Sequence, residues 1–541
     1  MVIPNILRTK TASALLRPYR SRVLALCLCT ALSSILQVVM AFATRQLVDA
    51  ALEKQTSLLL WGSIMIAILL ALVILHATVS WVGGRTSEIC MADLRRAVLA
   101  RAVYAEGAEL SGYHSGELLN RSMEDVRTLC DGMVNVIPSM VGQLVRLGAS
   151  FAAAVLLFPS VTWLIAMVAV FVVIGAAIFR PLMKKRQMDV RKADAHVMTA
   201  LQEDLQNLEL IKSLGAEQQS LKRFDLRLTD FLKALLQRRV LYVGRNTLIS
   251  AVSQLGTGAL LIWGATRIAG GIMTYGTMAA MLQLIALLRN PVFGLSGLWT
   301  RMAAVDVAGE RLEQILSQKE EQEETNAVTG VNQIVLENVT FAYPGENVPV
   351  LENFSCRFDL NHWVCLTGIS GKGKTTLFKL ILGLYQPQEG RVYLNTPQGE
   401  VPCGPGTRHL FSYVPQNYAL LSGSILDNLL LASPNATHEQ IVEALKLAQA
   451  DFVWSLPAGE NTLVQENNAG LSMGQLQRLA VARAFLMDRP ILLLDECTSA
   501  LDLETESALL STVLSMNKCG ILVTHHPDAV MGKTNVIMKS I

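Results

Sequence analysis

The sequence of residues 363–384, WVCLTGISGKGKTTLFKLILGL, decides how the chain is interpreted. Residues 368–375 within it fit the pattern GxxxxGK[ST], between an apolar run typical of a strand and a helical run. In that context the glycines let backbone N–H groups close around phosphate oxygens, and the helix N-terminus adds a positive field. The alternative for the pattern alone is a glycine-rich turn with a stray lysine. The residues predicted to hold nucleotide phosphates are Gly368, Ser370, Gly371, Lys372, Gly373, Lys374, Thr375 and Thr376.

A second stretch supports a phosphate site. Residues 491–496 read ILLLDE, which predicts a buried strand that ends in two carboxylates. Ligands bind at the carboxyl ends of strands in open parallel sheets. Asp495 is therefore expected to hold Mg²⁺ through a water molecule, with Thr375 as a ligand, and Glu496 is expected to polarise an attacking water. Without the phosphate loop, the two acids could simply be a solvated strand end.

Further motifs follow in order along the C-terminal half. Residues 471–475 read LSMGQ and precede QRLAVARA at 477–484. Tyr343 lies in FAYP, Gln416 in YVPQ, and SALD at 499–502 precedes His525 in VTHH. This set resembles the ABC ATPase domain, whose signature sequence reads LSGGQ and is lacking in other phosphate-loop enzymes.

The resemblance implies a role for these residues. Tyr343 would stack on adenine, Gln416 would lie near Mg²⁺ and the coupling contacts, and His525 would contact the γ-phosphate. ATP and Mg²⁺ are the implied cofactors. The implied catalytic residues are Glu496, His525 and Gln416, and the implied metal ligands are Thr375, Gln416 and Asp495.

The resemblance also implies a partner. In the family, ATP is clamped between the phosphate loop of one ATPase domain and the signature sequence of another. The residues that would reach ATP across this interface are Ser472, Gly474, Gln475 and Asp502. A chain with one such domain must therefore pair with a second half-transporter, either another copy of itself or a homologous chain.

Two residues depart from the family pattern. Met473 replaces the first glycine of the signature pair, where glycine allows a close approach to ATP. Lys372 adds a positive charge beside the phosphates, at a position where a small residue is common. We expect hydrolysis to be retained, because the chain has all four of Lys374, Asp495, Glu496 and His525. The alternative is that Met473 contributes to the weaker of two unequal ATP sites.

The composition is that of a membrane protein. Hydrophobic residues make up 51% of the 541 residues and charged residues 17%, whereas soluble domains carry about 25% charged residues. The net charge of +2 gives no reason to expect nucleic-acid binding. The nine cysteines have no CxxC pair at metal spacing, so we interpret them as reduced, small hydrophobic residues.

Six apolar stretches are long enough to span a bilayer as helices, which takes about 20 residues. Basic residues concentrate between the second and third stretches and between the fourth and fifth, which predicts that these segments, both termini and the ATPase domain are cytoplasmic. We therefore expect an integral protein of the cell (plasma or inner) membrane. The predicted spans are 21–43, 57–79, 133–158, 161–179, 247–269 and 275–297.

The pattern changes after a charged linker at 317–332. The apolar runs at 334–343, 363–367, 410–414, 491–494 and 520–524 alternate with helical stretches. This alternation predicts a parallel sheet flanked by helices. The predicted organisation is an all-α transmembrane domain with long cytoplasmic helix extensions at 1–316 and an α/β phosphate-loop ABC domain at 333–541.

This organisation resembles a half-size ABC exporter. It implies ATP-driven export of a peptide, lipid or hydrophobic small molecule by alternating access. A heterodimeric exporter with unequal ATP sites and an ATP-gated channel or regulator are the alternatives. Arg146 falls within the third span, where a charged residue usually faces an interior or a cavity. It either contacts an anionic group of the substrate or pairs with a backbone carbonyl or a polar neighbour.

Overall fold

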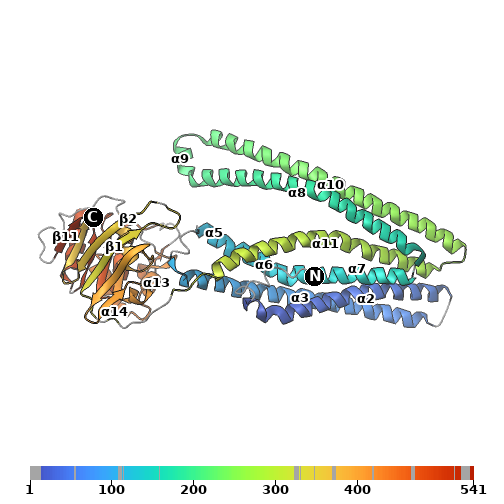
Figure 1. Cartoon of the computed structure of the whole chain (residues 1–541), viewed down its shortest axis with the longest axis horizontal. Helices are drawn as coiled ribbons and strands as arrows, with labels where there is room; N and C mark the ends of the chain where they lie inside the picture. Colours follow the sequence, from blue (N-terminus) through green and yellow to red (C-terminus); the bar gives the residue numbers. More distant parts are fainter. Residues whose placement is uncertain are drawn as a thin grey trace. The chain divides into compact units, whose positions relative to one another are not determined.

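The computed structural model describes residues 14–541, except 54–56, 108–112, 114, 158, 322–327, 329, 347, 368–372, 417–419, 465–469, 517, 525–535 and 541. The chain forms two compact units, Met1–Val98 with Leu119–Leu316 and Leu99–Leu118 with Ser317–Ile541. The first unit is helical and the second is built on β-sheets (Figure 1). The prediction of a helical domain followed by an α/β domain is confirmed.

Long helices dominate the described part of the first unit, and short ones connect them. The long helices are α2 (Arg20–Leu52), α3 (Leu58–Tyr104), α7 (Ile137–Leu157), α8 (Pro159–Gln206), α10 (Glu217–Ala269) and α11 (Tyr275–Leu316). The short ones are η2 (Arg17–Tyr19), α5 (Ser115–Asn120), η3 (Arg121–Asp125), α6 (Val126–Asp131), η4 (Gly132–Val136) and α9 (Leu208–Ser213).

Within the described residues, four helical stretches are long and apolar enough to cross a membrane. They are Arg17–Leu52, Leu58–Tyr104, Gly116–Leu157 and Glu217–Ala269. The fourth and sixth predicted spans fall in α8 and α11. Among the described residues of α11, the apolar helical segment is Tyr275–Leu288, which is shorter than the four long stretches. The six span boundaries therefore stay a prediction.

Small polar side chains bring two of these helices together. The hydroxyl of Thr30 in α2 donates to the carbonyl of Pro138 in α7 at 3.0 Å, and Ser34 donates to the carbonyl of Gly142 at 2.8 Å. Helices α8 and α10 lie side by side as an antiparallel hairpin (Figure 1). The turn at its end contains α9 and Gly215, whose φ is 61°.

The second unit contains a parallel and an antiparallel sheet. The parallel sheet has the order β11-β3-β10-β9-β6, and the antiparallel sheet has the order β2-β1-β4-β5. The strands are β1 (Gln333–Phe341), β2 (Leu351–Asp359), β3 (Trp363–Thr367), β4 (Glu389–Thr396), β5 (Gly399–Pro402), β6 (Phe411–Val414), β9 (Ile491–Asp495), β10 (Cys519–Val523) and β11 (Val536–Ser540). A separate pair is formed by β7 (Gly423–Ser424) and β8 (Leu463–Val464).

One strand prediction was wrong. We expected the apolar run at 334–343 to join the parallel sheet, but β1 pairs antiparallel with β2 and β4. Gln333 lies opposite both Asp359 and Asn395. An apolar run has the same appearance in either kind of sheet, so its pairing partners could not be assigned from the pattern.

The parallel sheet is the centre of the second unit. Every residue of β9 is buried, as expected for a parallel strand covered on both faces. Its described helices are α12 (Lys374–Ile381), α13 (Ile425–Leu430), α14 (His438–Leu447), α15 (Met473–Leu486) and α16 (Leu503–Ser515), with 3₁₀ turns η5 (Pro405–Leu410), η6 (Asp451–Ser455) and η7 (Gly459–Asn461). In the sheet order, only β10 lies between β9 and β3, the strand that leads into the predicted phosphate loop.

Candidate nucleotide site

The C-terminal end of the predicted phosphate loop begins a helix. Gly373 is the N-cap of α12 with φ 89°, a conformation that favours glycine, and a Cβ there would lie 2.9 Å from Cδ2 of Leu351. Lys374 and Thr376 in the first turn are buried. These residues therefore lie at the positive end of a helix, where phosphate binds. The predicted residues Gly368, Ser370, Gly371 and Lys372 lie outside the described residues.

Asp495 ends β9 as a buried carboxylate. Its side chain is 0% exposed, and neither carboxylate oxygen has a hydrogen-bond partner within the described part of the chain. Burial raises the pKa of Asp495, while the neighbouring Thr375 hydroxyl lowers it; the charge of Glu496 raises it and that of Lys374 lowers it. A buried carboxylate beside a hydroxyl is a donor set that suits a hard cation such as Mg²⁺. The residues present therefore fit the predicted metal site.

Glu496 has an unusual backbone conformation. Its φ is 50°, in the left-handed region that non-glycine residues rarely adopt, and its N–H donates to the carbonyl of Val523 in β10 at 3.1 Å. The amide Nε2 of Gln416 donates to Oε2 of Glu496 at 2.7 Å. Gln416 follows β6, which neighbours β9, so the sheet brings together two residues that were predicted separately. Backbone strain of this kind is typical of functional positions.

Tyr343 lies against the phosphate helix. Its hydroxyl is 3.0 Å from the hydroxyl of Thr376, and Nζ of Lys379 lies 5.1 Å from its ring centroid. Edge-on contacts with Phe341 and Tyr385, at centroid distances of 5.2 and 5.4 Å, fix the orientation of the ring. The predicted adenine contact is thus beside the phosphate site, and its stacking role stays a prediction.

The predicted signature residues form a helix start. Ser472 is the N-cap of α15: its hydroxyl accepts from the N–H of Gln475 at 3.3 Å, and Oε1 of Gln475 accepts from the N–H of Ser472 at 2.8 Å. Met473 follows at the first helical position and is 59% exposed. A Cβ at Gly474 would lie 2.8 Å from the carbonyl oxygen of Ala500, so a larger residue would displace that loop.

Asp502 starts the next helix. It caps α16 by accepting a bond from the N–H of Thr505 at 3.0 Å, and this bond keeps the pKa of Asp502 below its usual value. His525, the predicted γ-phosphate contact, lies outside the described residues.

Gln477 lies beside the predicted site residues, although no sequence motif gives it a role. Its side chain is buried; Nε2 donates to the hydroxyl of Ser499 at 3.0 Å, and Oε1 accepts from the N–H of Ala500 at 3.0 Å. It therefore ties the signature helix to the loop that follows Glu496. A polar residue in an otherwise apolar helical face was the available signal.

Arg146 lies in α7 of the helical unit. Its Nε is buried without a hydrogen-bond partner among the described residues, as are Oε1 of Gln143 and Oγ of Ser150 on the same helix. These polar atoms favour an interior position for this face of α7. A contact with substrate stays a prediction.

Comparison with known proteins agrees with both units. The family model described as "ABC transporter transmembrane region" matches residues 23–292, and the one described as "ABC transporter" matches residues 351–499. A solved bacterial Atm1-family ABC exporter with ATP bound superposes with a TM-score of 0.79, covering 96% of this chain and 93% of that chain. The identity is 21%, so this likeness concerns the fold alone.

Curated relatives extend the match. The lactococcin-A transport/processing ATP-binding protein LcnC of Lactococcus lactis subsp. lactis is 33% identical over 64% of this chain, and the match spans about half, 49%, of that relative's length. A Staphylococcus aureus ATP-binding/permease protein whose name refers to multidrug export is 27% identical over 84% of this chain and 80% of its own length. With one ABC transmembrane region and one ABC ATPase region in a single chain, this protein belongs to the ABC transporter superfamily and has the organisation of the half-size exporters.

Proposed function

We propose that this chain is a subunit of an ATP-driven exporter, in which ATP binding and hydrolysis drive alternating access of the membrane domain. The observation that carries the proposal is the buried carboxylate of Asp495, which lies beside the Thr375 hydroxyl and meets no cationic side chain in a hydrogen bond among the described residues. It lies next to Glu496, at the end of the sheet where α12 also begins. A buried carboxylate without a cationic partner is costly unless a metal ion binds it, so the site is suited to a metal-bound nucleotide.

The chemistry follows from the residues that surround this carboxylate. Lys374 and the N-terminus of α12 would bind phosphate oxygens, and His525 would contact the γ-phosphate. Glu496, held by Gln416, would orient the attacking water. Mg²⁺ held by Thr375, Asp495 and Gln416 would neutralise charge on the phosphate oxygens.

We further propose that the working unit is a dimer of half-transporters. The signature residues on α15 and Asp502 on α16 would complete the ATP site of the partner. The hairpin of α8 and α10 supports an additional interface, because it exposes large apolar side chains outside the predicted membrane spans. These exposed residues include Leu201, Leu205, Leu208, Leu210, Leu221, Leu226, Leu232, Leu236 and Val240.

The cargo and location are part of the same proposal. The relatives are named for lactococcin transport and for multidrug export, which supports a peptide or hydrophobic small molecule, with lipid as a further class. The concentration of basic residues in the segments after the second and fourth predicted spans supports insertion in the cell membrane with both termini and the ATPase domain in the cytoplasm.

A heterodimer is the second candidate. Met473 is exposed at the start of α15, where the family has glycine, so its side chain would meet the partner's nucleotide. A chain with a weakened signature would suit one of two unequal ATP sites.

The experiment is ATP hydrolysis by this chain purified alone in lipid discs, with Glu496→Gln as the inactive control and mass photometry to count subunits. Activity above the control in two-subunit particles supports the homodimer. Two-subunit or single-subunit particles with no activity above the control would refute the homodimeric exporter and direct the search to a partner chain.

A further inference from the structure

The segment that joins the two domains is bonded to the end of α3. Ala105 and Glu320 form an isolated antiparallel bridge, and the N–H of Glu321 donates to the carbonyl of Tyr104, the last residue of α3, at 2.8 Å. The guanidinium of Arg101 in α3 forms an ion pair with Glu320 at 2.9 Å and donates to the carbonyl of Gln318 at 3.1 Å. The end of α3 and residues 318–321 are therefore joined by backbone hydrogen bonds and by the side chain of Arg101.

Arg408 connects this piece to the phosphate helix. One Nη of Arg408 donates to Oε1 of Glu321 at 2.8 Å and the other donates to Oε2, so the ion pair is bidentate. The same guanidinium donates to the carbonyl of Leu382, the C-cap of α12, at 2.8 Å and to the carbonyl of Gly383 at 3.0 Å. A cation at the C-terminus of a helix satisfies carbonyls that lack helical partners and complements the helix dipole.

Arg408 is also tied to the strand that carries the acids. Its own carbonyl, and that of Phe411, accept bonds from Nη1 of Arg489 at 2.8 and 2.9 Å. Arg489 lies two residues before β9, which ends at Asp495. Arg408 therefore contacts the phosphate helix through its side chain and the strand of the metal site through its backbone.

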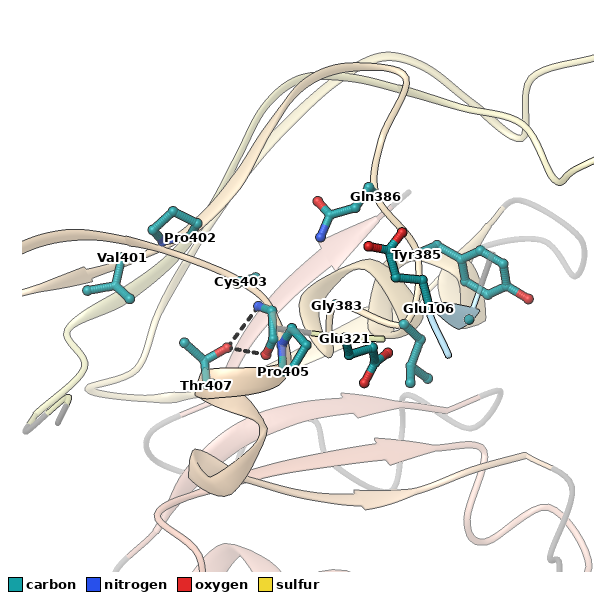
Figure 2. Close-up of a pocket in the computed structure, with 14 residues that line it drawn as sticks. Glu106, Glu321, Gly383, Tyr385, Gln386, Val401, Pro402, Cys403, Pro405 and Thr407 are labelled. Atoms are coloured by element: carbon teal, nitrogen blue, oxygen red, sulfur yellow. Dashed lines mark hydrogen bonds between the residues drawn. The ribbon is translucent and has the colours of Figure 1, made fainter. Parts of the chain in front are cut away.

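A second close contact lies beside the ion pair. A Cβ at Gly107 would lie 2.4 Å from the carbonyl oxygen of Leu384, so the backbone after α3 packs directly on the segment after α12. A pocket of about 290 Å³ adjoins this contact, with Glu106 and Glu321 lining it near Gly383 (Figure 2). The bidentate ion pair therefore lies beside a cavity as well as beside this backbone contact.

We propose that Glu321 and Arg408 form a positioning pair, here called the linker clamp, that couples the phosphate helix α12 to the cytoplasmic end of α3. Movement of α12 on nucleotide binding would be transmitted through Leu382 and Gly383 to Arg408, then through Glu321 to α3, a single helix that extends from Leu58 to Tyr104. The proposal rests on the proposed function, because it needs ATP to favour one of two conformations. Neither residue belongs to the predicted nucleotide site.

The test is hydrogen–deuterium exchange of the full chain in lipid discs, without nucleotide and after trapping with ATP and vanadate. The peptide covering 94–104 reports on the end of α3. We expect Glu321→Gln to reduce the nucleotide-dependent change in this peptide by about half or more, a loss typical of coupling residues. The KM for ATP should stay within about two-fold of wild type, because the nucleotide site is intact. The matched control is Glu400→Gln, which removes another ion pair of the same domain, that of Glu400 with Arg391 at 2.7 Å. This control should keep the full nucleotide-dependent exchange change at 94–104.

The outcomes separate two failures. A wild-type chain that neither hydrolyses ATP nor changes its exchange refutes the homodimeric exporter. A responsive wild type with an equal response in Glu321→Gln overturns the linker clamp alone. Glu321→Gln keeps Arg408 on the α12 carbonyls, so it decides the question even if Arg408→Ala does not fold. If Glu321→Gln lowers the stability of the protein but keeps the full nucleotide-dependent exchange change at 94–104, the linker clamp is also overturned. The ion pair then has a structural role only.

Discussion

The side-chain amide of Gln416 donates a hydrogen bond of 2.7 Å to the carboxylate of Glu496, 80 positions further along the chain. The two residues follow neighbouring parallel strands, β6 and β9, and Glu496 is held at φ 50°. A carboxylate fixed by its backbone and by one amide donor is positioned to orient a water molecule. Because of this hydrogen bond, the effects of substituting Gln416 and Glu496 on hydrolysis should depend on each other.

Glu496→Gln should abolish hydrolysis while ATP still binds, because the amide cannot polarise water. A loss of about 10²–10⁴-fold in kcat is typical for removing a general base. Phosphate release and nucleotide binding would be measured on the same lipid-disc preparation. Glu504→Gln in the first turn of α16 is the control and should retain activity. Undiminished hydrolysis in Glu496→Gln would remove this residue from the mechanism.

Gln416→Ala should lower kcat about tenfold with little change in the KM for ATP, because one hydrogen bond to a charged group contributes about 1.5–3 kcal/mol. Steady-state kinetics check the split. In the Glu496→Gln background the further loss should disappear, since the bond no longer positions a base. Additive losses would show that Gln416 acts independently of Glu496.

Asp495→Asn should stabilise the nucleotide-free protein and eliminate stabilisation by Mg²⁺ and ATP. Because burial raises the pKa of Asp495, the folded protein holds this proton more tightly than the unfolded chain, and its stability falls as pH rises between the two pKa values. At neutral pH the asparagine removes this penalty, so Tm should rise by about 2–4 °C for each kcal/mol recovered. Differential scanning calorimetry with and without Mg²⁺ and ATP measures both effects. Asp488→Asn, at an exposed ion pair with Lys518, should leave Mg²⁺-dependent stabilisation unchanged.

Ser472→Ala should cost about 1 kcal/mol of stability through loss of the N-cap, and should also reduce hydrolysis if the hydroxyl contacts nucleotide. Thr437→Ala is a matched control, because Thr437 caps α14 with the same reciprocal arrangement, through Gln440. We expect the two variants to lose similar amounts of stability, measured by thermal unfolding. Only Ser472→Ala should show slower hydrolysis, measured by phosphate release. Equal activity in the two variants would limit Ser472 to a capping role.

Met473→Gly should raise the ATPase activity of the chain alone if methionine limits the approach of the partner's nucleotide. Glycine at an exposed helix start costs at most about 1 kcal/mol. His438→Gly, at the first position of α14, provides the same backbone change away from the signature. An unchanged rate in Met473→Gly would show that methionine is tolerated and would leave the homodimer without this obstacle.

Much of this protein could be inferred from local sequence. The site residues Lys374, Thr375, Asp495 and Glu496 could be predicted because phosphate and metal binding require particular residues at fixed spacing after apolar strands. The helical domain was predicted because a bilayer requires about 20 apolar residues in succession. Both kinds of signal depend on neighbours along the chain, so they are visible without a fold.

Tertiary structure decided what depends on residues far apart in the chain. The pairing of β1 with β2 and β4 and the bond from Gln416 to Glu496 follow from strand order, which apolar runs do not encode. The contact of Arg408 with Glu321 and with the end of α12 joins segments that carry no shared motif. Such bonds form only when the core has fixed the backbone, because a single ion pair or hydrogen bond is too weak to order distant segments by itself.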